Sequence, residues 1–181
     1  RKNACINNYN NGIHIWNSNL NMIINNSCSI NGNGSLLYNS KSNSYQNNTF
    51  SFNNDGIYLI LSNANYFFHS NISSSIGNGL LLDNSNSNIF EDCRIETTTG
   101  IGVNLSNKIN DCMIINSTII NSTKFDFYLN GDSHLKLINC TFKQEKIKYI
   151  DKKSNLTIQW FIHLNVMNTT NVPIENASIV I

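Results

Sequence analysis

Hydrophobic and small polar residues recur along the chain in units of about 22 residues. The units open at Gly12, Gly34, Gly56, Gly79, Gly100 and Lys124. Three positions later comes an apolar residue, at Ile15, Leu37, Leu59, Leu82, Val103 and Phe127. Serine follows six positions after the start at Ser18, Ser40, Ser62, Ser85 and Ser106, and asparagine nine positions after it at Asn21, Asn43, Asn65 and Asn88. Such a fixed period is typical of solenoid proteins.

The second half of each unit is periodic too. Apolar residues recur at Ile23, Tyr45, Phe67 and Phe90, and again at Cys28, Phe50, Ile72 and Ile95. Each unit therefore predicts three short strands, which pair with the same strands of the next coil about 4.8 Å away. A leucine-rich repeat would need a Leu-x-x-Leu-x-Leu pattern that is missing here, and helical repeats are longer and poorer in Asn, Ser and Gly.

Each repeated position has a predicted role. The opening glycine permits a turn with positive φ between coils. The first and third residues after it point inward, and the residue between them points outward. Ser and Asn at the corners bind turn backbone groups and stack on their equivalents in adjacent coils as a ladder.

Two segments carry a resemblance to a known repeat. GIHIWNSNLNMIINNSCSI, which begins at Gly12, and GIYLILSNANYFFHSNISS, which begins at Gly56, resemble the right-handed parallel β-helix repeat of NosD-type and other archaeal or bacterial surface proteins. The resemblance covers roughly residues 1–155 and implies an all-β, right-handed parallel β-helix with three short strands per coil. It does not imply one function, because related coils carry lyases, hydrolases, epimerases, adhesins and inert stalks.

The pattern changes near the C-terminal end. We predict a β-helix over residues 1–154, entered in the middle of a coil, and the beginning of a truncated β-sandwich over residues 155–181. Leu156–Val166 is a long, partly alternating strand, and the segment after Met167 is similar to the opening hairpin of a carboxypeptidase-regulatory-like or Ig-like domain. The chain has no initiator Met or signal peptide and ends in an apolar run, so we expect a piece of a longer protein whose anchor lies elsewhere.

Charge and composition limit the classes of binding partner that we expect. The net charge is +1 and only 13% of residues are charged, so we expect neither nucleic acid nor an anionic membrane as a partner. No apolar run has the roughly 18 residues of a membrane span. Asparagine is unusually abundant, and an AT-rich genome is one explanation for this bias.

Cysteine and histidine give no metal motif. The five cysteines form no CxxC pair, and Cys28, Cys93 and Cys140 fall at repeated coil positions typical of small core residues. The four histidines, His14, His69, His134 and His163, lie at unrelated coil positions. We therefore expect no copper, zinc or other cofactor.

The acidic residues offer one candidate enzyme site. Glu91, Asp92 and Glu96 lie close in sequence to Arg94, with Asp83 before them and Asp111 after them. Carbohydrate-active β-helices use carboxylates from adjacent coils. We predict, however, that these residues occupy different faces of the coil and form surface ion pairs.

The outward face of the first strand is the candidate binding surface. Its exposed rings could stack on sugars or dock another domain. The candidate ligand-binding residues are His14, Trp16, Tyr38, Tyr58, Asp83, Asp126 and Tyr128. Leu36, Ile60, Leu81 and Asn104 share the face, which a generic strand propensity would also explain.

These observations predict an extracellular or cell-surface β-helix that acts as a non-catalytic stalk or adhesin-like scaffold. Its expected partners are a polysaccharide, a cell-surface glycan or adjacent domains of the same chain. The alternative is a polysaccharide lyase, glycoside hydrolase or epimerase, which needs carboxylates and a basic residue converging in one groove.

Overall fold

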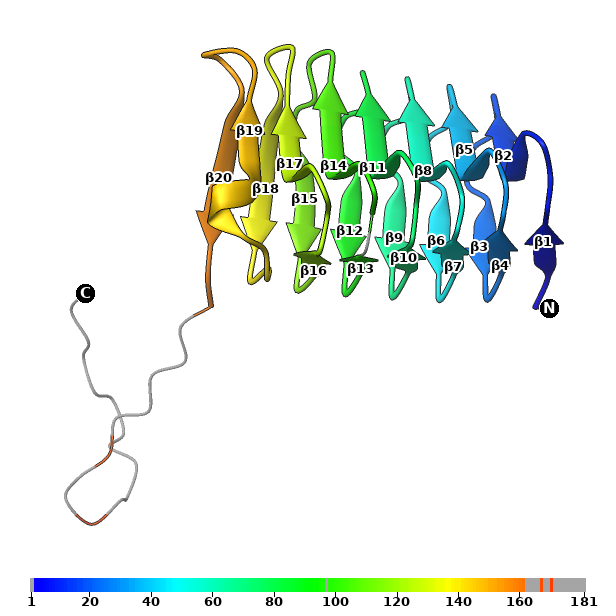
Figure 1. Ribbon diagram of the computed structural model, residues 1–181, viewed down its shortest axis with the longest axis horizontal. Coiled ribbons are helices and arrows are strands. Elements are labelled where there is room, and N and C mark those ends of the chain that lie inside the picture. The colour runs from blue at the N-terminus through cyan, green and yellow to red at the C-terminus, as the bar shows by residue number, and fades with distance from the viewer. Residues whose placement is uncertain (1, 97, 162–166, 168–169, 171–181) are drawn as a thin grey trace.

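The computed structural model describes residues 2–96, 98–161, 167 and 170 and shows a parallel β-helix of about seven turns (Figure 1). Each coil of about 23 residues contributes one strand to each of three parallel sheets. The predicted three-strand coil is therefore confirmed. Within the described part of the chain the one helical segment is a short 3-10 helix, η1 (Gln144–Lys146), and no helix there is long and apolar enough to cross a membrane.

The three sheets follow the three strands of the coil. Sheet 1 contains β2 (Asn11–Trp16), β5 (Asn33–Tyr38), β8 (Asp55–Ile60), β11 (Asn78–Asp83), β14 (Ile101–Ser106), β17 (Phe125–Leu129) and β19 (Ile147–Tyr149). Sheet 2 contains β3 (Met22–Ile24), β6 (Ser44–Gln46), β9 (Tyr66–Phe68), β12 (Ile89–Glu91), β15 (Cys112–Ile115), β18 (His134–Ile138) and β20 (Asn155–Gln159). Sheet 3 contains β1 (Ala4–Ile6), β4 (Ser27–Ser29), β7 (Thr49–Ser51), β10 (Asn71–Ser73), β13 (Arg94–Glu96) and β16 (Thr118–Ile120).

A single core runs along the axis of the β-helix. Alternation along each strand sends every second side chain inward, and stacking in register places like residues in contact. In sheet 2 the ring of Phe67 stacks between Tyr45 and Phe90, with centroid distances of 4.7 and 4.6 Å. The Tyr45 hydroxyl lies 2.8 Å from Oγ of Ser35, so the one polar atom of this buried stack is satisfied.

Hydrogen-bonded ladders line the corners, as predicted. In one column the Nδ2 of Asn21 donates to Oδ1 of Asn43, and the same bond links Asn43 to Asn65 and Asn65 to Asn88. The same Oδ1 atoms accept the backbone N–H of the preceding asparagine. Each buried amide therefore closes a turn and joins two coils.

The glycines have a packing role rather than the predicted turn role. Their expected positive φ is wrong: among the described residues the only glycine with positive φ is Gly131 (71°). A β-carbon on Gly56 would lie 2.2 Å from Cγ2 of Ile72, and one on Gly79 would lie 2.4 Å from Cγ2 of Ile95. Glycine is needed because the third strand of the coil packs directly against the first.

The positive-φ positions are instead taken by residues with side chains. They lie at the ends of strands, where the chain turns towards the next sheet, and asparagine is the commonest residue there. Asparagine tolerates the left-handed region better than other residues because its short amide bonds locally. Turn geometry thus accounts for part of the asparagine bias.

The structure corrects the start of the last two units. Asn78 pairs with Ile101 and Leu80 with Val103, so Gly79 lies beside Gly102 rather than Gly100. The pairing of β14 with β17 likewise places Asp126, not Lys124, in the glycine column. Longer turns in these coils shift the register, and Ser106 consequently pairs with Asp83 instead of continuing the serine column.

The β-helix continues past the predicted domain boundary. β20 (Asn155–Gln159) pairs in parallel with β18 and completes sheet 2 (Figure 1). The β-sandwich predicted for residues 155–181 rests mainly on positions outside the described residues and stays a prediction. His163 also lies outside them.

Candidate functional site

The outward face of sheet 1 carries two columns of side chains in register. The first column is His14, Leu36, Tyr58, Leu81, Asn104, Tyr128 and Lys148. The second is Trp16, Tyr38, Ile60, Asp83 and Ser106. Six of the seven predicted ligand residues therefore lie on this face.

Three rings gather at the N-terminal end of the face. The Trp16 ring lies 5.5 Å from the His14 ring and 5.1 Å from the Tyr38 ring, measured between centroids. Trp16 is 60% exposed. We call His14, Trp16 and Tyr38 the aromatic platform, because it offers flat apolar faces to solvent.

A hollow rich in amides adjoins the platform. It has a volume of about 280 Å³ and is lined by Asn17, Asn19, Asn39, Ser40, Lys41, Leu61 and Asn63. Asn17 and Asn39 directly follow Trp16 and Tyr38, and the Nδ2 of Asn39 donates to Oδ1 of Asn17 at 2.8 Å. Within the described residues, the Nδ2 groups of Asn19 and Asn63 donate no hydrogen bond to protein.

Tyr58 lies in the middle of the face near two carboxylates. Its pKa is raised, first by burial and then by the charges of Asp83 and Asp55. Both carboxylates also hold the fold: Asp55 Oδ1 accepts from the backbone N and Nδ2 of Asn78, and Asp83 Oδ1 accepts from Nδ2 of Asn107. Tyr58 is thus a protonated phenol at neutral pH rather than a base.

Asp126 is not on this face, contrary to the prediction. It occupies the glycine column and is fully buried, since the sixth unit starts two residues later than expected. Its Oδ2 accepts the backbone N–H of Lys143 at 3.1 Å, which holds the turn before η1. Asp126 is therefore removed from the candidate binding residues, whereas Tyr128 lies where predicted.

The acidic cluster divides between two sheets and the turn that joins them. Glu91, on sheet 2, accepts a 2.6 Å hydrogen bond from the Tyr66 hydroxyl. Glu96, on sheet 3, pairs with Arg94 at 2.6 Å, and Asp92 pairs with His69 at 3.2 Å in the turn between these sheets. These are the surface pairs that the sequence predicted, and they form no common groove.

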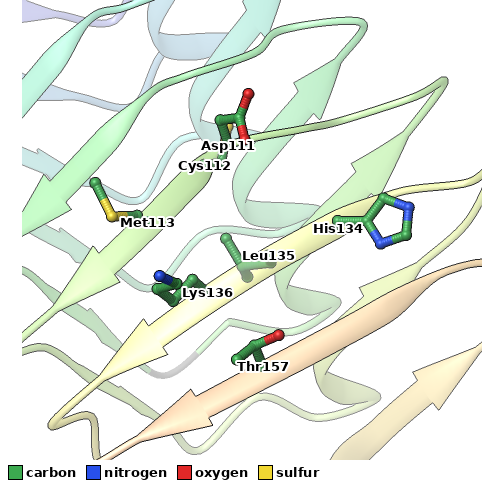
Figure 2. Close-up of a pocket in the computed structure, with 7 residues that line it drawn as sticks. All are labelled: Asp111, Cys112, Met113, His134, Leu135, Lys136 and Thr157. Atoms are coloured by element: carbon green, nitrogen blue, oxygen red, sulfur yellow. The ribbon is translucent and has the colours of Figure 1, made fainter.

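A hollow of about 360 Å³ lies on sheet 2, and Figure 2 draws the residues that line it. Its side chains come from three neighbouring strands or the turns before them and are Asp111, Cys112, Met113, His134, Leu135, Lys136 and Thr157. The Cys112 thiol, however, bonds within the corner ladder, accepting from the backbone N of Asn88 and donating to the carbonyl oxygen of Ser85. His134 Nε2 lies 3.3 Å from Oδ1 of Asp132, in the turn before it.

A larger hollow of about 680 Å³ lies at the corner after sheet 1. It is lined by Asn84, Asn107, Lys108, Asn130, Gly131, Asp132, Asp151, Lys152 and Lys153. This hollow was not predicted, because its residues come from the turns of four successive coils. Two signals point to it: asparagine repeats after the strands that end at Asp83 and Ser106, and lysines cluster after the last clear unit.

Asp151 organises the rim of that hollow. Its carboxylate accepts from the backbone N–H groups of Gly131, Lys153 and Ser154, at 2.8 to 2.9 Å, and from Oγ of Ser154 at 2.8 Å. A longer bond of 3.4 Å comes from the N–H of Asp132. The bond from the Ser154 hydroxyl is the largest cause that lowers the pKa of Asp151 to about 2.

Acid should therefore loosen this turn. Because the folded pKa lies below the ordinary 3.8, the stabilisation is complete above pH 3.8 and is lost as pH falls through about 2. We expect Asp151→Asn to lower the melting temperature at pH 7, and the difference from the native protein to vanish near pH 2. Circular dichroism melting curves between pH 7 and 2 test this. Glu145→Gln, which removes an exposed carboxylate from η1, is the control, and a pH-independent difference for Asp151→Asn would contradict the assignment.

The thiols are core groups. Cys28, Cys93, Cys112 and Cys140 are buried, and burial raises the pKa of Cys28 and Cys93 to about 12 and that of Cys112 to about 11. Such thiols stay protonated at neutral pH, and metal ions bind thiolates. Over the described residues, no group of three or more His, Cys, Asp or Glu side chains could hold a metal ion.

Comparisons with known proteins agree with this architecture. The family model of the periplasmic copper-binding protein NosD matches residues 1–111, and that of the right-handed β-helix region matches residues 59–179. Among curated proteins, none matches the sequence significantly.

The likeness to solved structures concerns the fold. The periplasmic alginate epimerase AlgG superposes with a TM-score of 0.76 at 13% identity, over 88% of this chain and 44% of the epimerase chain. A point mutant of that epimerase gives a TM-score of 0.60 at 10% identity, over 88% and 51%. The chain thus spans about half the length of the structures it matches.

The family name refers to copper, and the described residues do not fit a copper centre. Burial raises the pKa of the buried thiols, and the described histidines pair separately with aspartates or, in the case of His14, lie edge-on to the Trp16 ring. The match to the two family models does not depend on a copper site, because the models follow the repeat over most of the β-helix. The chain belongs to the NosD family and contains a right-handed β-helix region.

Proposed function

We propose that the protein is a non-catalytic, glycan-binding scaffold that acts outside the cytoplasm, at the cell surface or in the periplasm. Its rigid coils would space neighbouring domains, and the outward face of sheet 1 would bind saccharide. The descriptions of both the matched family and the similar epimerase as periplasmic support a location beyond the inner membrane.

The observation that carries the proposal is the aromatic platform next to the amide hollow. Sugar rings have apolar faces that stack on Trp and Tyr and hydroxyl rims that bond to amides. Trp16 and Tyr38 supply the rings, while Asn19 and Asn63 supply amide donors that have no acceptor among the described residues. These groups lie on strands and their adjoining turns, so they are held in place before a ligand binds.

The carboxylates support a non-catalytic role. On sheet 1, Asp55 and Asp83 accept hydrogen bonds from asparagines of neighbouring coils. Glu91, Glu96 and Asp92 are paired on other faces or corners. A lyase or epimerase needs a carboxylate and a basic residue converging on one sugar, and these acidic groups are committed to the coil itself.

Binding to a polysaccharide array tests the proposal. We expect Trp16→Ala and Tyr38→Ala each to weaken binding of a retained glycan by at least about tenfold, which corresponds to about 1.4 kcal/mol. Tyr66→Ala, which removes a ring from the outward face of sheet 2, is the matched control and should leave binding unchanged. If both platform variants bind as the native protein does, the proposal is wrong. If the native protein cleaves or epimerises the glycan, the enzyme alternative replaces it.

A further inference from the structure

The corner hollow after sheet 1 is lined by three lysines, Lys108, Lys152 and Lys153; we call it the lysine hollow. Its volume of about 680 Å³ falls within the range of small-molecule sites. It lies at the end of the outward face of sheet 1, where Asn107 bonds to Asp83. It is therefore continuous with the proposed glycan-binding face.

None of the three ammonium groups lies in an ion pair among the described residues, where the ion pairs involve Asp92, Glu96 and Asp132. The two carboxylates of the hollow are held by its turns: Asp151 accepts hydrogen bonds from Gly131 and Ser154, and Asp132 lies against His134. Three lysines and two aspartates give the lining of the hollow a net positive charge, which favours anions.

Amides extend the hollow along the axis of the β-helix. Asn84, Asn107 and Asn130 directly follow β11, β14 and β17, so they lie on three successive coils. Within the described part of the chain, the side chains of Asn84 and Asn130 make no hydrogen bond. A row of amides suits an elongated ligand with many hydroxyl groups rather than a compact inorganic anion.

We propose that the lysine hollow binds an acidic saccharide segment of the uronate class. Sugar carboxylates would pair with the three ammonium groups, and sugar hydroxyls would bond to the row of asparagines. Lysine acts as a flexible point charge, which suits carboxylates spaced along a polymer. This inference rests on the proposed glycan-binding function and names the charge class of the ligand.

The test uses the full chain with Lys108, Lys152 and Lys153 all replaced by Gln. Calorimetry with alginate oligosaccharides is expected to show binding weakened at least tenfold relative to the native protein. The salt dependence should also flatten, because fewer charges are paired. Binding of neutral cello-oligosaccharides should be unchanged. The matched control replaces Lys2, Lys124 and Lys136 with Gln, which removes the same charge elsewhere, and should bind both sugars as the native protein does.

Each outcome either supports or overturns the proposal for the lysine hollow. Native-like binding of the acidic sugar by the hollow variant, or equal loss in the control, would overturn the proposal. Full competition by inorganic phosphate would show a simple anion site, and tighter binding of a single-stranded oligonucleotide would show a nucleic-acid site. If Trp16→Ala and Tyr38→Ala both bind as the native protein does while the hollow variant loses acidic sugar, the platform fails as the glycan site and the lysine hollow itself is the glycan site.

Discussion

Replacing Phe67 with alanine is expected to lower the free energy of unfolding by about 3–5 kcal/mol. Phe67 is fully buried, and its ring stacks on Tyr45 in the coil before and on Phe90 in the coil after. Its loss would leave a cavity between the Tyr45 and Phe90 rings, because each of these rings is held in place by its own strand. Urea denaturation followed by circular dichroism measures the change.

Phe52→Ala is the matched control for this prediction. Phe52 is 62% exposed in a turn, so its truncation removes little buried surface and should change stability by less than about 0.5 kcal/mol. Equal destabilisation by the two variants would show that the stacked rings do not stabilise the core more than an exposed ring does. A loss of cooperativity in Phe67→Ala alone would show that the coils on either side unfold separately.

Gly56→Ala should be nearly as damaging, although it adds only one methyl group. The new β-carbon would lie 2.2 Å from Cγ2 of Ile72 and 2.5 Å from the carbonyl oxygen of Gly79. The second contact is with the backbone of the next coil, which cannot move without breaking the register of sheet 1. We expect a loss of about 3 kcal/mol, at the upper end of the cost of overpacking.

Gly77→Ala is the control that separates the cost of steric overlap in the folded protein from the effect of alanine on the entropy of the unfolded chain. There the β-carbon would first meet Oδ1 of Asp55 at 2.6 Å and the nearest backbone atom only at 3.1 Å, so it strains one hydrogen-bonded side chain rather than the backbone of the next coil. Gly77→Ala should therefore cost clearly less than Gly56→Ala. Equal unfolding midpoints in urea for the two variants would contradict the interpretation of the glycine column.

Most of the fold could be predicted from the sequence, because every residue of a coil has the same neighbours as its equivalent in the next coil. The recurrence of Tyr45, Phe67 and Phe90 is enough to place a core column, and that of Asn21, Asn43 and Asn65 is enough to place a ladder. Where turns lengthen, the recurrence weakens. Gly100 and Gly102 are both plausible starts by spacing, and only strand pairing decides for Gly102.

The candidate site was predictable only in part. Strand alternation correctly placed Trp16, Tyr38 and Tyr58 on one face, because a period of two needs no knowledge of turns. The same rule failed for Asp126 once the start of its unit was wrong by two. The lysine hollow could not be predicted by spacing, because irregular turns of several coils bring Lys108 close to Lys152.

The asparagine ladder gives the stack of coils a direction, because its amide oxygens are all oriented the same way along the axis. In the column from Asn21 to Asn88, each asparagine oxygen from Asn43 onwards faces the earlier coil and accepts an amide N–H from it. The Nδ2 groups of Asn43, Asn65 and Asn88 also donate back to backbone carbonyls of earlier coils. The side chains thus form one hydrogen-bonded chain and polarise one another. The column ends at Cys112, whose sulfur accepts the backbone N–H of Asn88 in place of an asparagine oxygen. The oxygen acceptors of the column therefore all face the N-terminal end of the β-helix, which gives the stack of coils a direction along its axis.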